Sequence, residues 1–388
     1  MRAFVLSLLI LFMAVPAHTG GDLCHWLVKG SPQIRATWRQ VGARETLSQF
    51  IRANARHYWA WMRTNASKHV AEFLKYEGMV VGDMHMGNFS IVVINGRLHM
   101  KVADFDDGGR APFVLDLARH IITTRSVNDS IKRWELTDAY QKGLRAEKMD
   151  PPEFIEEILE TSKKKVQRWE DEYVDNNTKK DRIKIDHEDF QPLPARTQPQ
   201  RERRDKIYEE IGRAVAPGKL IDLIKVMREE GGAAGVQRYR GLVRRNGRDM
   251  IVEFKHIAEP ATSQWSLQKT PRERLKHLLE LFWESLHTRD PHYGIVEIEG
   301  ESFWMRPKPL SLIDIPYTST KKSSQEFVRE LSLYQAYLLG KLHGSQASGR
   351  RFLREIDKEP DAFYETVRTL AKDYQNLAEG VFKRGQEN

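Results

Sequence analysis

The chain has 388 residues, of which 40% are hydrophobic and 30% charged, and its formal net charge is +8. This length predicts one large domain or two moderate ones, and the composition is typical of a soluble globular protein. The modest charge is compatible with an anionic ligand. The sequence has no zinc-ligand spacing, recognition-helix motif or RNA-binding aromatic motif, so we expect no nucleic-acid binding.

Residues 1–19 differ from everything that follows them. Arg2 gives a short positive start, Ala3–Val15 is an apolar run, and Val15-Pro16-Ala17 supplies small residues for cleavage. This pattern is typical of a signal peptide, and the run is short for a transmembrane helix. We therefore expect a secreted or periplasmic protein with no stable membrane insertion after cleavage. The alternatives are an uncleaved anchor and a misassigned start, and the second would leave the protein cytoplasmic.

The next part of the chain, residues 20–161, is expected to combine helices with three strands and to form part of the lobe that carries the motifs below. Residues 31–78 have apolar residues at helical spacing, and Met79–Val81 predicts a short strand. Two apolar segments follow, Phe89–Ile94 and Leu98–Ala103. Because Asn95-Gly96 lies between them, they predict a β-hairpin.

Polar residues flank this hairpin in a pattern that suits phosphoryl transfer. Asp83 and Asn88 precede its first strand on a tight loop, and Asp104 and Asp106 follow its second strand. In kinases one aspartate orients the attacking hydroxyl, while an asparagine five residues later and a second aspartate hold magnesium. Carboxylate and amide oxygens are the hard ligands that magnesium prefers. We therefore predict Asp83 as the catalytic residue and Asn88, Asp104 and Asp106 as metal ligands.

Three linked motifs extend this interpretation into a family resemblance. Gly82-Asp83-x-His85-x-x-Asn88-Phe89, Asp104-Phe105-Asp106 and Asp116-Leu117-x-Arg119 together resemble the bacterial domain of unknown function family 2252. That family belongs to the protein-kinase-like superfamily, which includes the aminoglycoside phosphotransferases. The resemblance implies an α+β, two-lobed kinase-like fold, with Asp116 bracing the catalytic loop from the following helix.

Residues 162–204 are expected to form a charged, mobile connection that contains one charged helix. Charged runs of both signs fill the segment, including Lys163–Lys165 and Arg201–Arg204, and Pro192, Pro194 and Pro199 interrupt it. A basic arm that binds a partner is the alternative, but the mixed charges favour a solvated connection.

A second glycine-rich element lies in residues 205–310, the expected sheet lobe. Gly232 and Gly235 precede a predicted hairpin with its turn at Asn246-Gly247, and the second strand of this hairpin ends at Lys255. Kinases cover nucleotide phosphates with such a glycine turn and contact them with such a lysine. The glycine segment and Lys255 also resemble the family, although Ala233 and His256 depart from its pattern. Since these elements precede the catalytic aspartate in ordinary kinases, we predict a permuted order.

The remaining segments complete the expected fold. Pro271–His287 predicts an amphipathic helix, on which Glu273 or Glu280 would orient Lys255, and spacing favours Glu273. Residues 311–388 are expected to be the helical remainder of the catalytic lobe. His343 matches a histidine of the family and is expected to cap a helix.

These patterns lead to a functional hypothesis with an alternative. We expect magnesium-dependent transfer of a phosphoryl, or another nucleotide-derived, group from ATP to an acceptor that the sequence does not identify. The alternative is a non-catalytic, nucleotide-binding kinase-like module that acts through protein interaction. A secreted location favours this alternative because ATP is scarce outside the cytoplasm.

Overall fold

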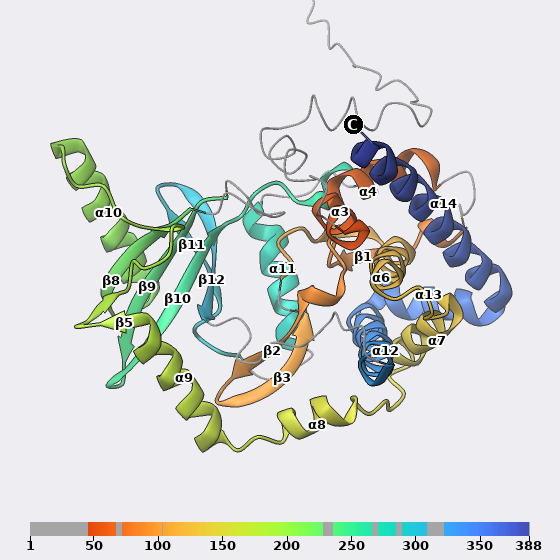
Figure 1. Cartoon of the computed structure of the whole chain (residues 1–388), viewed down its shortest axis with the longest axis horizontal. Helices are drawn as coiled ribbons and strands as arrows, with labels where there is room; N and C mark the ends of the chain where they lie inside the picture. The colour runs from red at the N-terminus through yellow and green to blue at the C-terminus, as the bar shows by residue number, and fades with distance from the viewer. Residues whose placement is uncertain are drawn as a thin grey trace, which may run out of the picture.

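The chain folds into an α+β structure in which most helices gather on one side and a six-stranded sheet forms the other (Figure 1). The computed structural model describes residues 46–66, 72–102, 104–227, 236–265, 271–284, 289–308 and 322–387. Residues 1–19, Gly232 and Gly235 lie outside these ranges. Within them, no helix is long and apolar enough to cross a membrane.

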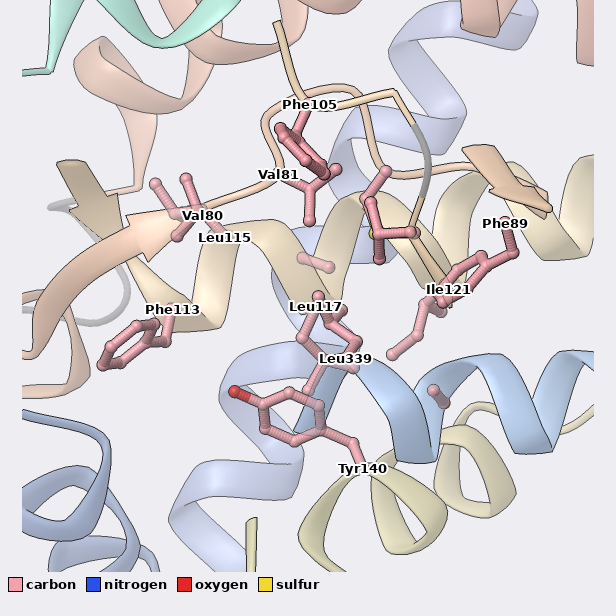
Figure 2. Packing of buried hydrophobic residues seen from close by; sticks show 14 of the residues in the cluster. Val80, Val81, Phe89, Phe105, Phe113, Leu115, Leu117, Ile121, Tyr140 and Leu339 are labelled. Carbon is pink, nitrogen blue, oxygen red and sulfur yellow. The ribbon is translucent and has the colours of Figure 1, made fainter. Parts of the chain in front are cut away.

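The helical side is built around α6 (Phe113–Val127), whose residues from Phe113 to Thr124 are all buried. Its neighbours are α3 (Leu47–Ala53), α4 (Ala55–Asn65), α7 (Arg133–Leu144), α12 (Lys322–Gly344), α13 (Ala347–Lys358) and α14 (Pro360–Glu387). Figure 2 shows how Leu117 and Ile121 of α6 pack beside Tyr140 of α7 and Leu339 of α12. This core holds the loops of the site in place.

Helices α7 and α12 approach closely because glycines lie at their contact. A Cβ atom on Gly340 would lie 2.1 Å from the carbonyl oxygen of Tyr140, and one on Gly143 would lie 2.0 Å from that of Tyr337. No side chain fits at these distances, so glycine is required at both positions.

Two small β-pairs lie against the helices. Strand β2 (Phe89–Ile94) pairs with β3 (Arg97–Val102), and the turn residues Asn95 and Gly96 have φ angles of 51° and 71°. The predicted hairpin is therefore confirmed. Strand β1 (Glu77–Val80) pairs with β4 (Gly109–Pro112), a strand that the sequence did not predict.

The larger sheet has the strand order β11-β12-β10-β9-β8-β7. Its strands are β7 (Phe190–Pro192), β8 (Lys219–Val226), β9 (Arg238–Arg245), β10 (Arg248–His256), β11 (Gly294–Ile298) and β12 (Glu301–Lys308). The predicted hairpin around Asn246-Gly247 is β9 and β10. Helix α10 (Gln198–Ala214) packs on one face of the sheet, and α9 (Lys163–Asn177) packs on the other with the short strands β5 (Thr178–Lys179) and β6 (Arg182–Ile183).

Residues 162–204 therefore contain α9, three short strands and the first turns of α10. The expected helix is present, but side chains of this segment also pack against both faces of the sheet. Val174 of α9 and Ile183 of β6 are buried against Leu242 and Ile251 of the sheet. Few apolar residues are enough for this packing, which explains why the charged sequence indicated only a connection.

Helix α11 (Pro271–Glu284) lies between the sheet and the helical side (Figure 1). Its residues Leu275, Leu278 and Phe282 belong to the core of the helical side, while the helix also contacts β11 and β12 of the sheet. Helix α8 (Glu153–Leu159) leads from α7 toward α9. The sheet and the helices thus share an apolar boundary at α11.

Candidate functional site

The loop after β1 is held from below by α6. The carboxylate of Asp116 accepts hydrogen bonds from the backbone N–H groups of Val81 (2.8 Å) and Gly82 (3.1 Å). The indole N–H of Trp59 donates to the carbonyl oxygen of Gly82 at 2.6 Å. Gly82 has a φ of +84°, and a Cβ there would lie 2.1 Å from the carbonyl oxygen of Asp107. Asp116 thus braces the backbone directly before Asp83, as the resemblance implied.

Asp83 is ionised and tightly held. Arg119, which is fully buried, donates to its Oδ1 atom from Nη2 at 2.5 Å and from Nε at 3.1 Å. His85 Nε2 lies 3.5 Å from Oδ2. Burial raises the pKa of Asp83, but the charges of Arg119 and His85 outweigh it and hold this pKa well below its usual range. Asp83 is therefore suited to accepting a hydrogen bond and is a weak base.

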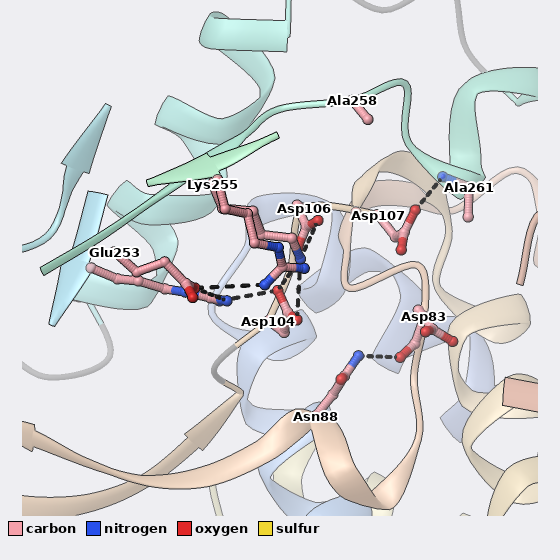
Figure 3. Close-up of polar contacts among 12 residues, drawn as sticks. Asp83, Asn88, Asp104, Asp106, Asp107, Glu253, Lys255, Ala258 and Ala261 are labelled. Carbon is pink, nitrogen blue, oxygen red and sulfur yellow. Dashed lines mark hydrogen bonds and ion pairs between the residues drawn. The ribbon is translucent and has the colours of Figure 1, made fainter. Parts of the chain in front are cut away.

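Asn88 lies on a single 3₁₀ turn, η1 (Met86–Asn88), at the start of β2. Its Nδ2 atom donates to the backbone carbonyl of Asp83 at 2.5 Å, as Figure 3 shows. The amide nitrogen thus fixes the loop. The amide oxygen is the atom of this side chain with the chemistry to bind a metal.

Asp104 and Asp106 follow β3 and meet Lys255 of β10 (Figure 3). The ammonium of Lys255, whose side chain is 3% exposed, lies 3.2 Å from Asp104 Oδ1 and 2.7 Å from Asp106 Oδ2. Arg306 of β12 donates to the same Asp104 atom at 3.2 Å. The fold thus brings Lys255 into contact with the two carboxylates, although 151 positions separate Lys255 from Asp104 in the sequence.

The two carboxylates have opposite pKa shifts. Burial raises the pKa of Asp104, but Lys255 and Arg306 outweigh this effect and lower it well below the usual value. Burial and then the negative charge of Asp104 raise the pKa of Asp106 to about 7. These two carboxylates share one lysine. A divalent cation bound beside them would add positive charge and so favour the ionised form of both.

Basic residues surround this pair on one face of the sheet. Glu253, which is 1% exposed, accepts hydrogen bonds from Arg306 at 2.8 and 2.9 Å and lies 3.3 Å from the ammonium of Lys308. Arg240 stands opposite Glu253 in the β9–β10 ladder, and Arg238 stands opposite Lys255. Five basic side chains, which we call the basic cluster, lie beside the carboxylates of Glu253, Asp104 and Asp106: Arg238, Arg240, Lys255, Arg306 and Lys308.

Lys308 shows how crowded the basic cluster is. Burial, together with the charges of Arg306 and Arg240, lowers the pKa of its ammonium to about 7 against the opposing effect of Glu253. An anion near this face would stabilise the charged lysine. Phosphate oxygens suit such a site because arginine binds them through paired hydrogen bonds.

The structure brings most, but not all, of the predicted site residues close together. Asp83, Asn88, Asp104, Asp106 and Lys255 lie together, whereas Glu273 is exposed at the start of α11. The carboxylates that Lys255 contacts are those of Asp104 and Asp106.

Sequence reasoning missed Glu253, Arg238 and Arg240. The alternation of side chains between the two faces of β9 and β10 could have identified them, since Glu253 and Lys255 are two residues apart and share a face.

His343 differs from the expectation of a helix cap. Its ring is fully buried, hydrogen-bonds to the hydroxyl of Tyr140 at 2.8 Å, and lies 3.3 Å from Asp116 Oδ2. It therefore packs behind the residue that braces the Asp83 loop and does not cap α12.

The oxygen atoms of this site can be compared with the ligands that a metal ion needs. Among the residues that the structure describes, no three histidine, cysteine, aspartate or glutamate side chains gather as a metal site. Asp104, Asp106 and Asn88 nevertheless offer hard oxygen atoms. Magnesium commonly takes only one or two protein carboxylates and completes its shell with phosphate oxygens and water. These residues fit magnesium that arrives with a phosphate ligand.

Comparison with known proteins gives one match and two negative results. No curated protein and no solved structure matches the chain. Residues 48–124, which include Asp83, Asn88, Asp104 and Asp106, match the model of a family described as "Uncharacterized protein conserved in bacteria (DUF2252)".

Proposed function

We propose that the protein is a magnesium-dependent phosphotransferase, which moves a phosphoryl group from ATP to an acceptor. In this proposal the six-stranded sheet and the helical side correspond to the two lobes of a kinase-like fold in permuted order. The contact of Lys255 with both Asp104 and Asp106 carries the proposal. In kinases a lysine of the sheet contacts the nucleotide phosphates, and an aspartate that follows the catalytic loop holds the metal. The contact brings a sheet lysine and such aspartates to one place.

Asp83 would orient the acceptor hydroxyl. Its low pKa, which Arg119 and His85 maintain against burial, keeps it ionised as a hydrogen-bond acceptor. Phosphoryl transfer passes through a loose transition state, in which the attacking hydroxyl loses its proton late. A well-positioned acceptor is therefore sufficient, and a strong base is not required.

Asp104, Asp106 and Asn88 would hold magnesium, which would supply positive charge to stabilise the phosphate groups. The protein contributes the positive charge around it. Lys255, Arg306 and Arg238 are each at most 3% exposed, and buried cations act more strongly on phosphate than solvated ones. The basic cluster would thus bind and align the phosphates of ATP.

A non-catalytic nucleotide-binding module, acting through protein interaction, is the second candidate. One observation favours it: both carboxylate oxygens of Asp83 are already engaged, Oδ1 by Arg119 and Oδ2 by His85. This candidate predicts nucleotide binding without turnover.

Formation of ADP from ATP in the presence of magnesium, with water as the phosphoryl acceptor, is measured for Asp83→Asn beside wild type and separates the two candidates. We expect wild type to form ADP and Asp83→Asn to lose about a hundred- to ten-thousand-fold of this activity, because asparagine cannot accept the proton. Asp138→Asn is the matched control, since Asp138 is exposed on α7 and forms an ion pair with the neighbouring Lys142. Equal activity of wild type and Asp83→Asn would contradict the role of Asp83, and binding without any ADP would favour the module.

A further inference from the structure

Helix α11 places a charged side chain, that of Arg274, in the interior of the protein. Arg274 is 2% exposed, whereas its neighbour Glu273 is exposed. A buried guanidinium is costly unless its donors are satisfied. Its Nη1 atom donates to the backbone carbonyl oxygens of Asp106 at 2.5 Å and Gly108 at 2.6 Å. Its Nη2 atom donates to the carbonyl oxygen of Ala258 at 3.2 Å. The guanidinium thus holds three carbonyl groups at once.

These carbonyl groups belong to two segments that meet at the candidate site, and Figure 3 shows both. Asp106 and Gly108 lie on the loop after β3, and the carboxylate of Asp106 contacts Lys255. Ala258 lies on the segment that follows β10, the strand of Lys255. Arg274 therefore links the strand that carries Lys255 to the loop whose carboxylate this lysine contacts.

Further contacts hold the loop after β3 in the same place. Oδ1 of Asp107 accepts a hydrogen bond from the backbone N–H of Ala261 at 3.0 Å, as Figure 3 shows. The backbone carbonyl of Asp107 accepts another from the hydroxyl of Thr262 at 3.2 Å. The ring of Phe105 packs against that of Phe282 on α11, with centroids 5.7 Å apart. Helix α11 thus contacts the loop through an aromatic side chain as well as through the guanidinium.

We propose that Arg274 is a positioning residue of the magnesium and ATP site. It fixes the backbone of Asp106 and so keeps the carboxylate of this residue beside Lys255 and Asp104, where the two carboxylates would share one cation. This inference rests on the function proposed above for the same site. Magnesium demands nearly ideal octahedral geometry, so a small displacement of one carboxylate weakens its binding.

Replacement of Arg274 by lysine tests the geometry without removing the charge. Lysine keeps the positive charge in a side chain of similar length, but its ammonium lacks the planar fork with which the guanidinium reaches three carbonyl groups. Arg272→Lys is the matched control, because Arg272 lies on the same helix with a side chain that is 58% exposed and forms an ion pair with Glu297.

Calorimetric titration with ATP at several magnesium concentrations is the first test. We expect Arg274→Lys to need about ten- to a hundredfold more magnesium than wild type for half-maximal binding, because residues that orient metal ligands typically have effects of this size. Arg272→Lys should need the same concentration as wild type. An unchanged magnesium requirement in Arg274→Lys would overturn the proposal. If wild type itself binds no ATP, the proposed function fails, and the second test decides the role of Arg274.

The second test measures the coupling between Arg274 and Lys255 in nucleotide-free protein. Urea unfolding gives the stability of Arg274→Lys, Lys255→Met and the double variant, and a cycle with Arg272→Lys is the control, in which the losses should add. We expect the double variant to lose less stability than the two single losses combined, by about threefold or more in the unfolding equilibrium constant. The reason is that an Asp106 carboxylate that Arg274 no longer positions gains less from Lys255. Additive losses would overturn the positioning role, since a residue that only supports the fold acts independently of Lys255. Failure of Arg274→Lys to fold would overturn it as well.

Discussion

Replacement of Lys255 by methionine is the perturbation that most directly probes the contact between sheet and hairpin. Methionine keeps an unbranched chain of similar size and removes the charge. The ammonium of Lys255 contacts Asp104 at 3.2 Å and Asp106 at 2.7 Å, and its side chain is 3% exposed. The variant therefore leaves two adjacent carboxylates with one cation fewer.

The structure sets the size of the expected loss. Removal of one partner from a buried ion pair costs about 3–5 kcal/mol. Arg306 remains beside Asp104, and Asp106 can take up a proton because its pKa is already raised to about 7. We therefore expect the unfolding free energy to fall by about 3 kcal/mol, the lower end of this range. Such a loss corresponds to a decrease in Tm of roughly 5–10 °C.

The loss is expected to depend on pH. The pKa of Asp106 is higher in the folded state than its unfolded value, so the folded state binds the extra proton and stability falls as pH rises toward 7. Lys255 lowers this pKa, so its removal raises the pKa further and extends the loss of stability to higher pH. The difference in Tm between wild type and Lys255→Met is therefore larger at pH 8 than at pH 5.

Thermal unfolding followed by circular dichroism at pH 5 and pH 8 measures this effect. Lys276→Met is the matched control, because the side chain of Lys276 is 67% accessible to solvent. It should leave Tm unchanged at both pH values. A Lys255→Met protein as stable as wild type at pH 8, or a loss that is equal at the two pH values, would refute the argument.

Two other substitutions test the basic cluster and the helix contact. Glu253→Gln leaves Arg306 and Lys308 without their buried carboxylate, so we expect a loss of about 3–5 kcal/mol in unfolding free energy, measured by urea titration. Added tripolyphosphate should restore part of that loss, and no effect of the polyanion would argue against an anion site. Gly340→Ala places a methyl group 2.1 Å from the Tyr140 carbonyl, so we expect at least about 1–3 kcal/mol of destabilisation. Gly212→Ala, where a Cβ meets nothing within 4 Å, is its control, and equal stability of the two variants would contradict the close packing of α7 on α12.

Local features of the fold could be predicted because short-range chemistry determines them. The turn residues Asn95-Gly96 and Asn246-Gly247 adopt positive φ angles, as their hairpins require. Strand β4 was missed because Gly109–Pro112 is short and contains glycine and proline, which are rare in strands. Its pairing with β1 is a tertiary contact that no local pattern indicates.

The candidate site was predictable where residues are close in sequence. Asp83 and Asn88 share one loop, and Asp104 follows the hairpin that this loop begins. The basic cluster was not predictable in the same way, because it depends on the register of three strands. Arg306 reaches Glu253 only because β12 pairs with β10 in the register that places them opposite one another.

Calorimetric titration of the protein with ATP, in the presence of magnesium and again in the presence of a chelator, tests the central proposal most directly. We predict binding with magnesium and much weaker binding without it, because Asp104 and Asp106 need the cation between themselves and the phosphates. Asp104→Asn should remove most of this difference, whereas Asp138→Asn should retain it. ATP that fails to bind at any magnesium concentration, or that binds equally well with the chelator, would contradict a magnesium-dependent nucleotide site at Asp104, Asp106 and Lys255.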